Sequence, residues 1–271
     1  MIEILNPARS RMENGQYSLG VNIRLARTVE IAPLMKTAGY DWLFIDLEHG
    51  PMSLDTAAQM CVTGLASGIA PIVRVPKGEY AMATRLLDNG ALGIVIPHVE
   101  STREAAEIVD RLKFPPVGHR SVAGTMPHLG FRNVPIGEAS KALNSATLLV
   151  AMIETPLGMT NAREIAEMPG IDVVMVGAND LCTEMGIPGD FGNPRFAEAL
   201  KQACADVHSA GKWAGIGGLY NEALLQTYLA FGIEWILAGS DVAFTLSAAT
   251  GRARFLRDAE EALSAKRVIA D

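Results

Sequence analysis

The sequence has few of the features that mark secreted or membrane-bound proteins. Its three cysteines, among 271 residues, are too few for a disulfide framework or a zinc cluster. No apolar run approaches the roughly 18 residues of a membrane span, and the first residues lack the apolar stretch and cleavage site of a signal peptide. We therefore expect a cytoplasmic protein with reduced cysteines and no membrane partner.

Basic charge is scarce as well. The formal net charge is -7, and lysines and arginines do not form the dense clusters that follow a phosphate backbone. Neither the glycine-rich dinucleotide-binding fingerprint nor the P-loop spacing occurs in the chain. These absences argue against nucleic acid and nucleotides, and we expect small-molecule partners.

A repeat of short apolar runs dominates the sequence. Most of these runs precede a segment with helical periodicity, as in repeated βα units. Ser53 and Ser101 resemble helix N-caps. Eight runs begin at Ser18, Asp41, Ala70, Ala91, Thr147, Ile171, Lys212 and Ile233. Eight units predict one (β/α)₈ TIM barrel, a single domain over residues 1–271.

One long segment, residues 114–143, lacks a clear pattern. Irregular connections of this length are uncommon in compact domains unless they are functional. We therefore expect this segment to be an active-site loop.

Polar side chains stand where several of the predicted strands end. In a (β/α)₈ barrel the carboxyl ends of the strands meet at one mouth, which is where such barrels carry out catalysis. The residues at these ends are Asp46, Glu48, His49, Arg74, Glu154, Asn179 and Asp180. The pattern predicts an active site formed by these residues.

Glu154 and Asp180 are candidate metal ligands. Two carboxylates with open positions beside them suit magnesium or manganese, whereas zinc prefers more nitrogen or sulfur. The alternative is purely structural: Glu154 pairs with an arginine, and Asp180 caps the helix that follows it.

Arg74 and His49 are candidates for the chemistry itself. Arg74 keeps its proton and offers a planar fork to a carboxylate or an enolate oxygen, and a salt bridge to Asp46 or Glu48 would also orient it. His49 is flanked by acids, and an imidazole, whose reference pKa is ~6.5, is a natural proton carrier. The other histidines, His98, His119, His128 and His208, are weaker candidates.

Asp88 stands in the last turn of a predicted helix, where the helix dipole opposes a negative charge. Such an unfavourable position invites a functional explanation.

Six motifs carry a family resemblance over most of the chain, from about Ser18 to about Phe255. They are DWLFIDLEHGP, PIVRVP, RLLDNGALGIVIPHV, FPPVGHRSV, IETPLGM and VGANDL, and in this order they resemble the HpcH/HpaI family of class II pyruvate aldolases. The resemblance implies reversible cleavage of 4-hydroxy-2-oxo acids to pyruvate and an aldehyde. It also implies a homohexamer in which the C-terminal helix is exchanged between subunits.

The resemblance implies roles for individual residues. A divalent ion (Mg²⁺, Mn²⁺ or Co²⁺) would bind Glu154 and Asp180, and pyruvate would chelate it. Arg74 would contact the keto oxygen, and the amides from Ala178 through Asn179 to Asp180 would help to hold the substrate carboxylate.

The resemblance also implies a proton relay. His49, with Asp88 from the same chain or from a neighbouring subunit, would carry the proton of the aldol hydroxyl, while Asp46 orients Arg74. Two departures leave the acceptor aldehyde open: Met152 replaces a frequent Gln, and Gly217 with Gly218 replaces a bulky apolar residue.

The main alternative to aldol cleavage is another reaction that passes through the same enolate. Oxaloacetate decarboxylation or a citrate-lyase-like cleavage would use the same ion and arginine. Cleavage of a coenzyme A thioester is less favoured because the chain lacks a basic surface for the nucleotide phosphates. A barrel that only binds a ligand is disfavoured by the concentration of polar groups at the strand ends.

Overall fold

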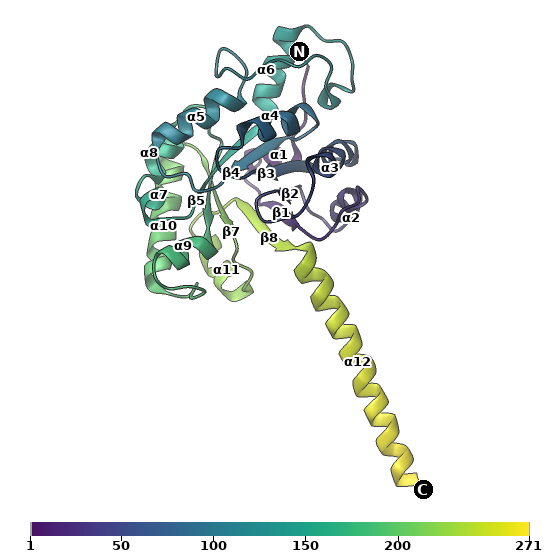
Figure 1. The fold of residues 1–271 in the computed structure, drawn as a ribbon. Helices are drawn as coiled ribbons and strands as arrows, with labels where there is room; N and C mark the ends of the chain where they lie inside the picture. The colour runs from purple at the N-terminus through teal and green to yellow at the C-terminus, as the bar shows by residue number, and fades with distance from the viewer. Residues whose placement is uncertain (1, 271) are drawn as a thin grey trace.

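Eight parallel strands form a closed barrel in the computed structural model, which describes residues 2–270 and the side chains of residues 2–263. Each strand pairs with the next one along the chain, and β8 pairs with β1 (Figure 1). The strands are β1 (Ser18–Ile23), β2 (Trp42–Asp46), β3 (Ala70–Arg74), β4 (Gly93–Ile96), β5 (Leu148–Ile153), β6 (Val173–Gly177), β7 (Trp213–Gly217) and β8 (Trp235–Ser240). The predicted (β/α)₈ barrel is confirmed.

Helices surround the barrel and connect its strands. They are α1 (Pro7–Glu13), α2 (Ile31–Thr37), α3 (Leu54–Ser67), α4 (Tyr80–Asp88), α5 (Thr102–Leu112), α6 (Ile136–Ala146), α7 (Pro156–Thr160), α8 (Ala162–Glu167), α9 (Ala178–Glu184), α10 (Pro194–Ser209), α11 (Glu222–Leu229) and α12 (Asp241–Ala270), with a 3₁₀ turn at Pro127–Leu129. Ser53 and Ser101 are N-caps as predicted, because their hydroxyls accept the N–H of Thr56 and Glu104.

Aromatic side chains fill the amino-terminal half of the barrel interior. The rings of Trp42 and Trp235 stack with centroids 3.9 Å apart, and α1 packs Ala8 and Met12 against the same cluster. Gly20 faces the Trp42 ring so closely that a Cβ there would overlap it. The interior is therefore closed at one end, and open space remains at the carboxyl ends of the strands.

The segment 114–143 lies at the closed end of the barrel, so the prediction of an active-site loop is wrong for the cavity of its own chain. The Phe114 N–H donates to Asn144 Oδ1 over 2.8 Å, and His128 Nε2 lies 2.9 Å from the carbonyl oxygen of Ala91, just before β4. The segment connects α5 to β5, and a connection from helix to strand must return to the amino-terminal end of the barrel.

The last helix, α12, continues from β8 and extends away from the barrel (Figure 1). Large apolar side chains along it are exposed in the single chain, including Phe255 and Leu256. Among the described residues, no helix is long and apolar enough to span a lipid bilayer.

Candidate active site

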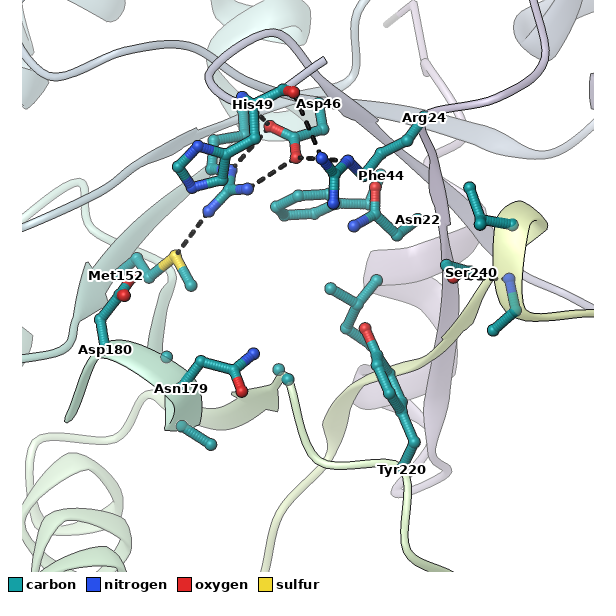
Figure 2. A pocket seen from close by; sticks show the side chains of 18 of the residues that line it. Asn22, Arg24, Phe44, Asp46, His49, Met152, Asn179, Asp180, Tyr220 and Ser240 are labelled. Atoms are coloured by element: carbon teal, nitrogen blue, oxygen red, sulfur yellow. Dashed lines mark hydrogen bonds and ion pairs between the residues drawn. The ribbon is translucent and has the colours of Figure 1, made fainter. Parts of the chain in front are cut away.

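A cavity of about 500 Å³ opens at the carboxyl ends of the strands (Figure 2). The residues predicted from sequence that line it are Asp46, His49, Arg74, Glu154, Ala178, Asn179 and Asp180. Residues that the sequence did not single out, among them Asn22, Arg24, Tyr220 and Ser240, complete its wall. Closure of the barrel therefore brings most of the predicted site together.

Arg74 is held rigidly in the floor of this cavity. It lies beside Asp46 in the register of β2 and β3, with Nε 3.0 Å from Asp46 Oδ1 and Nη2 2.7 Å from Oδ2. Burial alone would raise the pKa of Asp46, but the two-bond pair with Arg74 outweighs burial and lowers that pKa. Asp46 is thus an ionised clamp, as its predicted orienting role requires.

The rest of the Arg74 guanidinium has two further neighbours. Nη1 lies 3.1 Å from Glu48 Oε2 and 4.0 Å from the sulfur of Met152. The carboxylates of Asp46 and Glu48 therefore fix the plane of the guanidinium. The thioether of Met152 lies beside its Nη1.

Glu154 is a buried carboxylate without a compensating cation in contact. Its Oε1 accepts the His98 N–H over 2.9 Å, while its Oε2 has no hydrogen-bond partner among the described residues. Burial, with a contribution from nearby Asp180, raises the pKa of Glu154 to about 8. Because the carboxylate is unsolvated and faces a second acid, the pair fits a cation between them.

His98 joins Glu154 and Asp180 in a group that can hold a metal ion. One ligand atom from each of the three lies within 4.8 Å of the others, and His98 Nδ1 is 3.3 Å from Glu154 Oε1. His98 has a φ of 54°, a left-handed conformation that is unusual for a side-chain-bearing residue. From the sequence this histidine was a weak candidate, although its position two residues beyond the fourth strand was the available signal.

Gly177 keeps the space around this group open. A Cβ at this position would overlap Glu154 Oε2, and the glycine is the residue immediately before α9. The absence of a side chain there leaves room for the unpartnered oxygen of Glu154.

His49 and Asp88 do not meet within one chain. His49 lines the cavity, with Nε2 3.7 Å from Glu48 Oε2. Asp88 ends α4 at the closed end of the barrel, where Arg120 Nη2 lies 2.6 Å from its Oδ1. Pairing of the two within the same chain is therefore wrong, because the end of a helix and the end of a strand lie at opposite ends of a (β/α)₈ barrel.

Comparison with known proteins agrees with this geometry. The family model described as HpcH/HpaI aldolase/citrate lyase matches residues 24–248. The chain belongs to this family.

Relatives within the family carry aldolase names. The chain is 40% identical to the 4-hydroxy-4-methyl-2-oxoglutarate aldolase of Hapsidospora irregularis, over 86% of this chain and 87% of that protein. It is 35% identical to the hydroxypyruvate/pyruvate aldolase of Agrobacterium fabrum, over 88% of each protein. The crystal structure of an HpcH/HpaI aldolase from Desulfitobacterium hafniense superposes with a TM-score of 0.87 at 25% identity, covering 92% of this chain and 96% of that one. This HpcH/HpaI protein is therefore a carbon–carbon lyase.

Two glycines line the cavity of this aldolase at the end of β7. Gly217 and Gly218 line it without side chains, and Gly218 has a φ of 86°. A Cβ at Gly218 would lie 2.7 Å from Asn179 Nδ2, so the glycine also lets this loop pack against the start of α9. The wall of the cavity is consequently open at the end of β7.

Proposed function

We propose that this aldolase reversibly cleaves 4-hydroxy-2-oxo acids to pyruvate and an aldehyde or other carbonyl compound, with a divalent ion such as Mg²⁺, Mn²⁺ or Co²⁺. The observation that carries the proposal is the buried, uncompensated Glu154 beside Asp180, across from the clamped Arg74. The pyruvate aldolase among the relatives supports the substrate class.

Glu154 and Asp180 would hold the ion, with His98 beside them. When bound, the ion would supply positive charge to the carboxylate and keto oxygens of pyruvate. The N–H groups of Ala178, Asn179 and Asp180 would donate to the pyruvate carboxylate, because the first N–H groups of α9 have no partner inside the helix.

Arg74 would stabilise the enolate. Its fork is oriented before the substrate binds, so it contacts the keto oxygen without a further ordering cost as negative charge develops there. Asp46 and Glu48 keep the guanidinium in place, and the pair with Arg74 keeps Asp46 ionised. His49 would take and return the proton of the aldol hydroxyl at the cavity mouth.

We also propose a homohexamer in which α12 packs on a neighbouring subunit and Asp88 reaches a neighbour's His49. The exposed apolar side chains of α12 support this assembly, as does the position of Asp88 away from its own cavity. The single domain over residues 1–271 and the cytoplasmic location remain predictions of the sequence.

The proposed function is tested by exchange of the pyruvate methyl protons for deuterium. We expect exchange that EDTA stops and that magnesium, manganese or cobalt restores. Borohydride with pyruvate should leave activity and protein mass unchanged, because no lysine lines the cavity among the described residues and Lys77 is held by Glu104 at 2.8 Å. A stable pyruvyl adduct, or exchange indifferent to EDTA, would contradict the proposal, and release of carbon dioxide from oxaloacetate without aldol activity would favour decarboxylation.

If His49 relays the proton of the aldol hydroxyl, its loss should affect aldol cleavage and exchange of the pyruvate methyl protons to different extents. His49→Ala should lower the rate of aldol cleavage by about 10²-fold, the usual contribution of a proton-transfer group. Exchange of the pyruvate methyl protons should fall much less, since the aldol hydroxyl is absent from that reaction. His208→Ala is the matched control, because His208 lies in the outer helix α10 and its ring contacts Glu234 rather than the cavity. Equal losses in the two assays would remove His49 from the relay.

A further inference from the structure

A second arginine lines the cavity and has no part in the proposed reaction. Arg24 follows β1, and its side chain stands above Asn22 on the side of the cavity away from Asp180 (Figure 2). Its side chain is 47% exposed, so the charge is accessible from the cavity mouth.

Among the described residues, no carboxylate forms a hydrogen-bonded ion pair with the Arg24 guanidinium. Its Nε lies 4.0 Å from Asp46 Oδ2, beyond hydrogen-bond distance, and both Asp46 oxygens already bind Arg74. Among the described residues, the hydrogen bond of the Arg24 guanidinium runs from Nη2 to the carbonyl oxygen of His49 over 3.3 Å. The remaining donors of the fork are available to a ligand.

The backbone that carries Arg24 is anchored. The carboxylate of Asp241, at the start of α12, accepts the N–H groups of Arg24, Leu25 and Ala26 at 3.1, 2.8 and 2.8 Å. Asp241 is itself buried. Because this loop is ordered before a ligand arrives, little binding free energy is lost in ordering it.

Neutral polar groups stand below Arg24 on the same wall. The side chains of Asn22 and Tyr220 point into the cavity, and the amide nitrogen of Asn22 is a hydrogen-bond donor (Figure 2). Burial raises the pKa of the Tyr220 hydroxyl, which therefore keeps its proton and can donate. This wall has the donors that a small anion needs.

We propose that Arg24 binds a carboxylate of the acceptor, so that the second substrate is a carbonyl compound carrying a carboxylate, such as a 2-oxo acid. This inference rests on the proposed function, which assigns pyruvate to Arg74 and the metal group. Arg24 contacts the main chain of His49, so an acceptor held there lies beside the proposed proton relay. The pyruvate methyl carbon loses a proton and bonds to the acceptor carbonyl carbon, whose oxygen gains a proton, and no other reactant is consumed.

The test compares two acceptors of similar size, glyoxylate and the uncharged glycolaldehyde, in aldol addition of pyruvate. Arg24→Gln keeps a hydrogen-bond donor but removes the charge, and it should lower kcat/KM for glyoxylate by about 30-fold, mainly through KM. Glycolaldehyde should be affected much less, and Arg24→Lys should recover part of the glyoxylate activity. Arg103→Gln, an exposed arginine of α5, controls for the change in net charge. Because the readout is a ratio between acceptors, any displacement of His49 affects both and cancels.

An unchanged ratio in Arg24→Gln would overturn the role of Arg24. Absence of pyruvate proton exchange in every protein would instead reject the proposed function. In that case binding is followed by NMR, with magnesium and oxalate present, for glycolate and ethylene glycol, which are the reduced forms of the two acceptors. Weaker glycolate binding by Arg24→Gln would retain the carboxylate site, and equal binding would reject it.

Discussion

Glu154→Ala and Asp180→Ala should each lower aldol turnover by on the order of 10³-fold, the scale expected when charge stabilisation of an enolate is lost. Each substitution removes one oxygen from a group whose ligand atoms lie within 4.8 Å of one another, so the affinity for the ion should fall with the activity. Binding of manganese, followed by electron paramagnetic resonance, measures that affinity without turnover.

The same variants should remain folded. Glu154 is buried, and its raised pKa of about 8 shows that the fold disfavours its charged form, so its removal relieves a cost to folding. Thermal unfolding of the metal-free proteins should give a Tm no lower than that of the unaltered chain. Glu164→Ala, on the exposed face of α8, is the matched control and should keep both metal affinity and turnover. Tight manganese binding by Glu154→Ala would refute the assignment of this carboxylate.

Arg74→Lys should lower kcat by about 10²-fold although the positive charge is kept. The guanidinium uses Nε and Nη2 on Asp46 and Nη1 on Glu48, so its plane is set by three contacts. An ammonium group cannot satisfy these acceptors and also reach the enolate oxygen from the same direction. Both cleavage and methyl proton exchange should fall, in contrast to the split expected for His49→Ala.

Two measurements make the Arg74 prediction specific. Arg163→Lys, on the exposed surface of α8, should leave kcat unchanged. The affinity of Arg74→Lys for manganese should stay close to that of the unaltered chain, because Arg74 would stabilise the enolate and is not assigned to hold the ion. If Arg74→Lys kept more than about a third of kcat, the guanidinium would be dispensable. A threefold loss is far smaller than the loss expected when one charge-stabilising donor is removed.

The barrel and the location of its mouth followed from the sequence alone. Repeating apolar runs and capping residues such as Ser53 are local signals, because they reflect the periodicity and end chemistry of each element. Once the runs are assigned to parallel strands, the residues that end them must face one mouth. Asp46, Arg74 and Glu154 could therefore be grouped before any coordinates were known.

Only the tertiary structure decided which side chains stand together at the mouth and which do not. His98 joins Glu154 through a left-handed backbone, and the backbone N–H of Arg24 is held by Asp241, more than 200 positions away in the chain. Asp88 and the segment 114–143 lie at the closed end instead. Contacts of this kind depend on barrel closure and on the end to which each connection returns, and both are set by packing between elements far apart in the chain rather than by local pattern.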